Sequence, residues 1–588
     1  MNLDMPHSER LMNRVAPWSL LLVTLTLQTA AAQNFEPVAV PDLPQVDGSS
    51  VAWADFDNDN RLDFLMLGTT NGNASGAIAQ LWRNTGTTFT NVAIDELPGL
   101  YLGCVAWGDY DSDGRIDFLI SGSRSANGGI SPTTQVWRNT ATGFSNVTSS
   151  VFSDLPNASQ SCAAWADFNL DGKLDLFFAG FSSTGKVAGI WLNTGSHFTN
   201  ATSSIAPGLL GVDLGSVSVA DFNNDGRPDL LLTGQLPNGQ ATIQLWQNNE
   251  SGFENVTEAL APGLPPIVNG STAWADFDND GRLDLILNGE STTPRVTQLW
   301  RNTGTGFVEF EVEGLAPSRL GHVQFGDVNN DGLLDFVVTG DIVGMDTTAI
   351  WLNSGNGFTN SGLSLPGAFS FANGSAALAD FDNDGRLDLL LSGMGPGSRT
   401  TTLLRNNLSI ESNAAPSAPA SPVATVEEGV TTLSWSPATD SESETNLTYN
   451  IAIGTTSGAD DIVSANADAS GFRKIVAHGN AGLNTSLKLR LPPGSYFWKV
   501  QAIDGAYAGG AFSSEQTFEV LPETAPTLTI VRTGATVTIS WEPATPGWIL
   551  QESENINPAS WDDAPSGSQN PVQLPVEDGN RFFRLHRP

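Results

Sequence analysis

Seven short acidic segments with the same spacing lie between residues 55 and 388. Each has Asp at its first position, Asp or Asn at the third, Asp at the fifth and Asp at the ninth. Carboxylate and amide oxygens at alternating positions of a tight loop suit Ca²⁺, which takes about six to eight oxygen ligands in a flexible geometry. The spacing therefore predicts a calcium-binding loop in each segment.

The predicted ligands are the side-chain oxygens of positions one, three, five and nine and the main-chain carbonyl of position seven. Position three is Asn in three segments, which keeps an oxygen but loses a charge, so we expect weaker binding there. Position six is Gly in six segments and Asn60 in the first, as a sharp left-handed turn favours. We expect up to seven structural Ca²⁺ ions, held by Asp55, Asp57, Asp59, Arg61, Asp63, Asp109, Asp111, Asp113, Arg115, Asp117, Asp167, Asn169, Asp171, Lys173, Asp175, Asp221, Asn223, Asp225, Arg227, Asp229, Asp276, Asp278, Asp280, Arg282, Asp284, Asp327, Asn329, Asp331, Leu333, Asp335, Asp380, Asp382, Asp384, Arg386 and Asp388.

Other interpretations of the segments fit less well. An EF-hand needs an acidic ligand at position twelve, where Met66 and Ile120 stand in the first two copies. Mg²⁺ favours retained waters and a strict octahedron over a cage made only of protein ligands. Acidic turns without metal are the remaining alternative, and repetition in register argues against it.

The intervals between the segments are 54, 58, 54, 55, 51 and 53 residues, which indicates a repeated structural unit. In the fifth unit, short apolar stretches at 271–275, 285–289 and 297–300 are followed by a turn at 302–304 and a further apolar start at 306–307. Short strands between Gly and Asn turns predict four antiparallel strands a unit, and seven units predict a seven-bladed β-propeller. The seventh unit lacks its fourth strand, so we expect residues 34–38 to complete it and close the ring. We expect the third-strand tryptophans to be core: Trp82, Trp137, Trp191, Trp246, Trp300 and Trp351.

The repeated loop, the Ala-Trp-Ala-Asp-Phe lead-in and the Trp-Arg-Asn-Thr-Gly turn resemble the FG-GAP/VCBS-type repeat, related to the propeller of integrin α-subunits. The resemblance covers about residues 34–407. It implies structural calcium ions at the loop positions given above and an extracellular binding or adhesion module. It identifies no partner.

Charge and composition limit the function classes. The formal charge is −37, and the sequence has no stripe of basic residues that could contact a phosphate backbone. We therefore expect no nucleic-acid binding. Arg10 and Arg14 precede an apolar run and small residues at 30–32, which predicts a signal peptide and an exported protein, secreted or at the cell surface. Met12 is an alternative start. No later stretch predicts a membrane helix.

Cys104 and Cys162 occupy the same position of neighbouring units. We expect them to form either a disulfide or two separate buried thiols.

The C-terminal third predicts two further β domains. Alternating strands and the Leu-Pro-Pro-Gly-Ser-Tyr segment at 491–496 resemble a fibronectin type III domain with its tyrosine corner. The last stretch resembles a short C-terminal domain of large secreted bacterial proteins. The chain is therefore all-β: signal peptide 1–32, propeller 33–408, linker 409–422, type III-like domain 423–522 and a small β domain 523–588.

The sequence favours a recognition or adhesion module over an enzyme. It contains no nucleophile elbow, zinc signature or phosphate loop, and the motif Asp residues are assigned to metal. We expect the partner to be an extracellular glycan, polysaccharide or protein, bound by the variable loops opposite the calcium loops. The alternatives are a carbohydrate-active enzyme (a polysaccharide lyase or glycosidase), its accessory subunit, and a purely structural surface protein.

Overall fold

The computed structural model describes residues 35–586, apart from 127–128, 292–294, 343–344, 347, 364, 366–371, 396–397, 443–445, 523–525, 543–547, 556–560 and 577–579. The predicted signal peptide lies outside the described residues. Within them, no helix has the length and apolar character needed to cross a bilayer.

Seven antiparallel sheets form the first part of the described chain. Six of them contain four strands, and the fifth contains four strands and three short additional ones. The first three sheets are β2 (Asp47–Ala54), β3 (Asp63–Thr69), β4 (Ala77–Asn84) and β5 (Phe89–Val92); β6 (Val105–Gly108), β7 (Asp117–Ala126), β8 (Gly129–Thr140) and β9 (Gly143–Asn146); and β10 (Ala158–Ala166), β11 (Asp175–Ser182), β12 (Gly185–Asn193) and β13 (Phe198–Asn200). The next two are β14 (Val217–Ala220), β15 (Asp229–Gln235), β16 (Ala241–Asn249) and β17 (Gly252–Asn255); and β18 (Val268–Ala275), β19 (Asp284–Glu290), β20 (Val296–Asn302) and β21 (Phe307–Phe310).

The sixth sheet holds β23 (Val323–Gly326), β24 (Asp335–Val338), β27 (Ala349–Asn353) and β28 (Phe358–Asn360). The seventh holds β29 (Ala372–Ala379), β30 (Asp388–Met394), β31 (Arg399–Asn406) and β1 (Phe35–Val38). Short connecting elements extend the fifth sheet or join sheets: β22 (Ser318–Arg319), β25 (Asp341–Ile342), β26 (Met345–Asp346), η1 (Ala74–Gly76), α1 (Thr148–Val151), α2 (Thr202–Ile205) and α3 (Thr257–Leu260).

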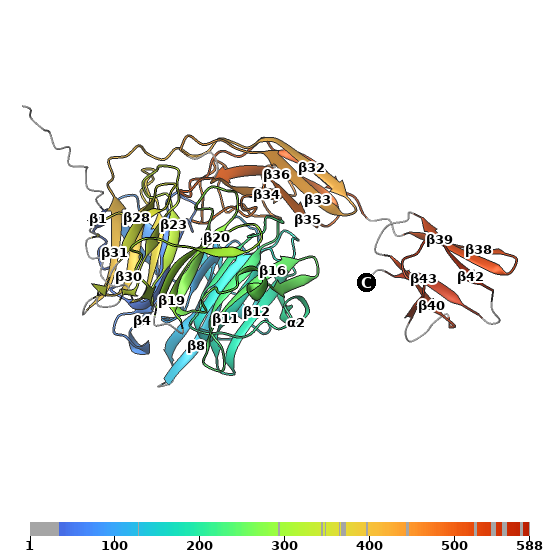
Figure 1. The fold of residues 1–588 in the computed structure, drawn as a ribbon, viewed down its shortest axis with the longest axis horizontal. Coiled ribbons are helices and arrows are strands. Elements are labelled where there is room, and N and C mark those ends of the chain that lie inside the picture. The colour runs from blue at the N-terminus through green and yellow to red at the C-terminus, as the bar shows by residue number, and fades with distance from the viewer. Residues whose placement is uncertain are drawn as a thin grey trace, which may run out of the picture.

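The sheets stand side by side (Figure 1). Their first strands contact one another in the cyclic order β2, β6, β10, β14, β18, β23, β29 and β2 again. Strand β1 pairs with β31 from Phe35 opposite Asn406 to Val38 opposite Leu403. This pairing confirms that the N-terminal strand completes the seventh unit, and it covers the edge that β31 would otherwise leave open.

Aromatic and aliphatic side chains fill the space between neighbouring sheets, as the period-two pattern of the strands requires. Trp53 stacks on Phe381, in the loop between β29 and β30, with ring centroids 6.4 Å apart. Leu390 and Leu403 lie in the same cluster. The six third-strand tryptophans are between 2% and 5% exposed, which confirms the prediction that they are core.

A second unit contains two three-stranded sheets packed on a common core that includes Trp435 and Trp498. The sheets are β32 (Ala420–Glu427), β33 (Val430–Ser436) and β35 (Ser486–Leu489), and β34 (Thr448–Gly454), β36 (Gly494–Ile503) and β37 (Gln516–Val520). The Tyr496 hydroxyl donates to the Pro492 carbonyl over 2.7 Å, the bond expected of a tyrosine corner. Strand β32 begins inside the predicted linker, because Ala420 already pairs with Ser436.

A third unit at the C-terminus has its own small core around Trp541 and Leu550. Its sheets are β38 (Thr527–Thr533), β39 (Thr536–Glu542) and β42 (Val572–Pro575), and β41 (Asp562–Asp563), β40 (Ile549–Ser553) and β43 (Phe582–His586).

Candidate metal centres

Each acidic segment forms the connection between the first and second strands of its sheet, with position one directly after the first strand and position nine opening the second. We call them loops 1 to 7, at 55–63, 109–117, 167–175, 221–229, 276–284, 327–335 and 380–388. In every loop the position-one carboxylate accepts hydrogen bonds from the backbone N–H groups of positions five and six, at 2.7 to 3.1 Å. These bonds curl the chain around the carboxylate.

The turn also needs left-handed backbone at two positions. Position six has φ of 62° at Asn60 and about 79° to 91° at the glycines, as the sequence predicts. Position four has a positive φ in all seven loops as well, although it is never Gly. In five loops this residue is Asn, which tolerates the left-handed conformation. In the other two it is Ser112 and Leu170, from which a left-handed residue could not have been predicted.

The structure brings three of the four predicted side-chain ligands together in loops 1, 2, 5 and 7. There, one carboxylate oxygen each from positions one, three and nine lie within 4.8 Å of one another. Position five is outside these groups, and its carboxylate pairs with the arginine at position seven: Asp59 with Arg61, Asp113 with Arg115, Asp280 with Arg282 and Asp384 with Arg386. Loops 3, 4 and 6 have Asn at position three and therefore fewer carboxylates.

One oxygen in each of these four groups is without a partner. The Oδ1 atoms of Asp57, Asp111, Asp278 and Asp382 are buried and accept no hydrogen bond from the described residues. A buried carboxylate oxygen left this way carries a desolvation cost that a cation would remove. The donor set, made of hard oxygens beside a carbonyl-bearing turn, fits Ca²⁺.

Burial also raises the pKa of the loop carboxylates. At position nine it raises the pKa of Asp63, Asp175 and Asp284 to about 8 and that of Asp117, Asp229 and Asp388 to about 9. At position one it raises the pKa of Asp55 and Asp380 to about 6. A bound divalent cation would favour the ionised form of each group.

Position nine has a second role that the sequence did not reveal. Its carboxylate accepts the backbone N–H of position two and that of an Asn at the end of the third strand, for example Phe56 and Asn84 on Asp63. The amide of that Asn then donates to the position-two carbonyl of the preceding loop, so it joins adjacent sheets. The seven bonds are Asn84 to Phe381, Asn139 to Phe56, Asn193 to Tyr110, Asn248 to Phe168, Asn302 to Phe222, Asn353 to Phe277 and Asn406 to Val328, at 2.7 to 3.0 Å. The recurring Trp-x-Asn sequence is the signal that could have identified them.

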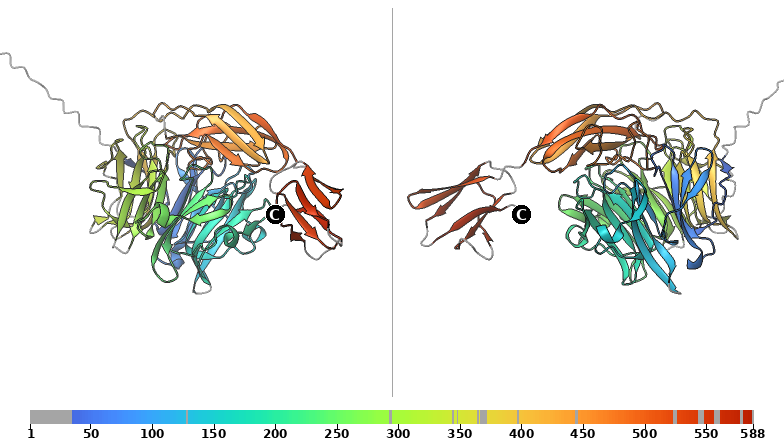
Figure 2. Two further views of the ribbon diagram at one scale, coloured as in Figure 1. Left: turned by 45° about the vertical axis from the view of Figure 1, so that its right-hand side comes forward. Right: turned by 180° about the vertical axis from the view of Figure 1, so that it is seen from behind.

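The second unit covers the end of the seven sheets where the loops lie (Figures 1 and 2). Its Lys474 carbonyl accepts the Asp55 N–H at 2.8 Å, and its Lys474 Nζ donates to the Gly114 carbonyl at 2.7 Å. Gly505 accepts the Asp327 N–H at 2.9 Å. Tyr507 donates from its hydroxyl to the Phe325 carbonyl at 2.6 Å. The segments 472–480 and 504–510 of the second unit therefore pack onto the loop face, which the sequence could not show.

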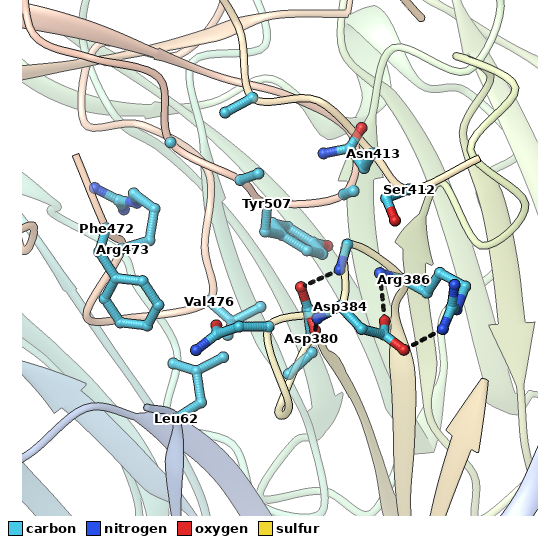
Figure 3. A pocket seen from close by; sticks show the side chains of 17 residues that line it. Leu62, Asp380, Asp384, Arg386, Ser412, Asn413, Phe472, Arg473, Val476 and Tyr507 are labelled. Atoms are coloured by element: carbon cyan, nitrogen blue, oxygen red, sulfur yellow. Dashed lines mark hydrogen bonds and ion pairs between the residues drawn. The ribbon is translucent and has the colours of Figure 1, made fainter. Parts of the chain in front are cut away.

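Loop 7 borders a cavity of about 370 Å³ at this contact (Figure 3). Asp380, Asp384 and Arg386 line one side, and Phe472 and Tyr507 of the second unit line another. The segment between the two units also contacts loop 7, because the Asn413 N–H donates to the Gly385 carbonyl at 2.9 Å. Loop 7 therefore borders a partly open cavity between the two units.

Cys104 and Cys162 are both free, so the disulfide alternative is wrong and the alternative of two separate thiols holds. Cys104 Sγ lies 3.8 Å from Ser161 Oγ. His322, at the same position of its unit, is packed with its Nδ1 buried and without a hydrogen-bond partner among the described residues.

Comparison with known proteins finds FG-GAP-like repeats at residues 167–232 and 327–391. The chain is 32% identical over 134 residues to a T-cell immunomodulatory protein homolog of Plasmodium falciparum, covering 20% of this chain and 18% of that protein. It is 28% identical over 169 residues to human cartilage acidic protein 1, covering 27% of this chain and 25% of that protein. The chain thus spans about a fifth to a quarter of the length of these relatives. Among solved structures, a Bacillus licheniformis rhamnogalacturonan lyase aligns with a TM-score of 0.36 and 13% identity over 63% of this chain and 75% of that one.

Proposed function

We propose that this protein is an exported, calcium-binding seven-bladed β-propeller that acts as an extracellular recognition or adhesion module for glycan or protein ligands. The seven sheets are its blades, the seven loops hold structural Ca²⁺, and the second unit is a fibronectin type III-like domain. The FG-GAP-like repeats support an extracellular binding role, and the cyclic contacts between first strands support a closed ring.

The position of the second unit is the observation that carries the proposal. It packs on the end of the ring where the calcium loops lie, through Lys474, Gly505 and Tyr507. The connections between second and third strands leave the ring at the other end and vary in length and sequence. Variable loops on a rigid scaffold are where recognition residues usually lie.

The free end also exposes apolar side chains. Ile130 is 66% exposed beside the β7–β8 turn, Phe181 is 45% exposed near the end of β11, and Leu210 is 50% exposed before β14. Exposed aromatic and aliphatic groups among polar loops are typical of a binding surface. We infer that this end, and not the calcium loops, contacts the ligand.

The test is a glycan and polysaccharide binding screen on the mature full chain, run with calcium and with a chelator. A calcium-dependent hit that disappears when the loops at 69–77 and 235–240 are replaced by Gly-Ser sequences supports the proposal. Binding that survives these replacements contradicts the assignment of the ligand-binding end. Product release from a bound polysaccharide would show the alternative, a carbohydrate-active enzyme.

A further inference from the structure

The residue that follows the third-strand Trp or Leu varies together with loop position three. In loops 1, 2, 5 and 7, where position three is Asp, this residue is Arg: Arg83, Arg138, Arg301 and Arg405. In loops 3, 4 and 6, where position three is Asn, it is Leu192, Gln247 and Leu352. The same pairing therefore holds in all seven repeats of one chain.

The structure gives a physical reason for the pairing. Nε of Arg138, Arg301 and Arg405 lies 2.5, 2.6 and 2.6 Å from Oδ2 of Asp111, Asp278 and Asp382. Arg83 pairs with the same oxygen of Asp57, Oδ2, but through Nη2. The other oxygen of each carboxylate, Oδ1, is buried and accepts no hydrogen bond from the described residues, and one oxygen of each of these carboxylates lies within 4.8 Å of oxygens from positions one and nine. The arginine thus holds one oxygen of position three and leaves the other for a cation.

In loops 3, 4 and 6 the side-chain amide of the position-three Asn forms hydrogen bonds within the loop, and no arginine from the third strand pairs with it. Asn223 and Asn329 donate from Nδ2 to the position-five carboxylates of Asp225 and Asp331, at 3.0 and 2.9 Å. Asn169 accepts the Asp171 N–H at 3.0 Å. A neutral amide needs no counter-charge, which fits the neutral residue at the third-strand position.

Counting each loop together with its third-strand residue gives nearly equal net charges. With every carboxylate ionised, as in the form that binds Ca²⁺, loops 1, 2, 5 and 7 hold four carboxylates and two guanidinium groups, a net charge of −2. Loops 3 and 4 hold three carboxylates and one cation, Lys173 or Arg227, again −2. Loop 6 has Leu333 at position seven and no cation, which leaves −3.

We propose that the third-strand arginine is a positioning residue that neutralises and orients the position-three carboxylate, so that both classes of loop present a net charge of −2 to one Ca²⁺ ion. This inference rests on the proposed calcium binding. It replaces the expectation that the Asn loops bind most weakly: loops 3 and 4 bind about as tightly as loops 1, 2, 5 and 7, and loop 6 binds tightest.

The test is a calcium titration of the full chain followed by hydrogen–deuterium exchange and mass spectrometry, which reads the protection of each loop separately. On the Coulomb scale of a partly exposed site, one unit charge near a divalent ion changes affinity by roughly tenfold. Asp57→Asn is expected to weaken loop 1 about tenfold, Arg83→Leu to tighten it about tenfold, and the double variant to return it to the wild-type midpoint. Arg124→Leu, an exposed arginine distant from the loops, is the control.

The other loops of the same molecule are internal references in each experiment. If Arg83→Leu weakens loop 1, or if the double variant binds as weakly as Asp57→Asn, the counter-charge inference is wrong. The Asp278→Asn and Arg301→Leu pair in loop 5 repeats the test where a loop 1 variant fails to fold. Absence of calcium protection in every wild-type loop would instead overturn the proposed calcium binding itself.

Discussion

Asn484 donates a hydrogen bond from Nδ2 to Asp221 Oδ2 over 2.7 Å, which joins the second unit directly to position one of loop 4. The same carboxylate oxygen accepts the Gly226 N–H at 2.7 Å. A predicted calcium ligand is therefore also an anchor for the neighbouring domain, and the order of the loop and the docking of the domain depend on each other.

Removal of this anchor is expected to loosen the docked domain. Asn484→Ala loses a hydrogen bond to a charged group, worth about 1.5 to 3 kcal/mol. We expect faster amide exchange at 481–487 and around loop 4, measured by hydrogen–deuterium exchange with calcium present. Asn238→Ala, in an exposed loop at the other end of the ring, is the control. Unchanged exchange at both segments would show that the bond does not hold the domain.

Removal of calcium is expected to lower the melting temperature of the full chain. A ligand that binds only the folded state stabilises it, by about 2.7 kcal/mol for each site at a hundredfold excess over Kd. Differential scanning calorimetry with chelator, with restored Ca²⁺ and with equal Mg²⁺ checks this. We expect Ca²⁺ and not Mg²⁺ to restore the melting temperature. A melting curve unaffected by verified metal removal would contradict a structural role.

Calcium binding is expected to release protons near pH 7. Burial raises the pKa of Asp63 to about 8 and of Asp117 to about 9, so these carboxylates are protonated in the calcium-free folded protein. Their folded pKa lies above the unfolded value, so their contribution to stability is complete below about pH 4, declines as pH rises, and is gone above the folded pKa of about 8 to 9. Ca²⁺ binds the ionised form, so its affinity rises with pH over this window.

Isothermal titration calorimetry at pH 7 in two buffers with different ionisation enthalpies measures this proton release. The observed binding enthalpy should differ between the buffers in proportion to the protons released. Equal enthalpies in both buffers would mean that the loop carboxylates are already ionised before calcium binds.

His322 is expected to make the protein sensitive to mild acid. Burial lowers its pKa from 6.5 to about 4. The unfolded chain therefore binds more protons at this residue, and the stability it contributes above about pH 6.5 is lost as pH falls toward 4. His322→Asn should show a smaller fall in melting temperature between pH 7 and 4.5 than the wild type.

The control for His322 is His197, whose Nδ1 lies 3.0 Å from Ser196 Oγ at an exposed turn. His197→Asn should retain the wild-type pH profile of melting temperature. Identical profiles for wild type and His322→Asn would mean that the His322 ring is charged without penalty in the folded protein.

The asparagines that join the sheets are expected to be among the most sensitive polar positions. Asn353→Ala removes the bonds to the Phe277 and Leu334 carbonyls, at 2.8 and 3.2 Å, and leaves buried carbonyl groups unsatisfied, at a cost of about 1 to 3 kcal/mol. Asn84→Ala, which breaks the bond to Phe381 between the first and seventh sheets, should cost a similar amount if the ring is closed.

Calorimetric melting of Asn353→Ala, Asn84→Ala and the exposed control Asn91→Ala checks this expectation. A loss for Asn353→Ala with none for Asn84→Ala would indicate that the first and seventh sheets are not held together in solution. Losses in both, with none for Asn91→Ala, support seven equivalent contacts around the ring.

The sequence by itself determined the repeat. Its all-β character, the seven units, the loop between first and second strands, and the pairing of the N-terminal strand with the last unit all follow from local spacing and turn residues. Position one and position nine are recognisable because the same carboxylates recur in register. A hydrophobic pattern with period two and a glycine at a sharp turn can be recognised from neighbouring residues alone, without knowing which distant residues they contact.

The tertiary structure decided what lies against each loop. The Asp57–Arg83, Asn84–Phe381 and Asn484–Asp221 contacts join residues 26, 297 and 263 positions apart. The recurrence of Arg and Asn after the third-strand Trp marks the first two as repeated features, but it does not say which residue each side chain contacts. The covering of the loop end by the second unit likewise depends on surfaces that meet only after both domains have folded. Local chemistry fixed which residues can hold a cation, and long-range packing fixed how much charge surrounds each one and which end of the ring stays free.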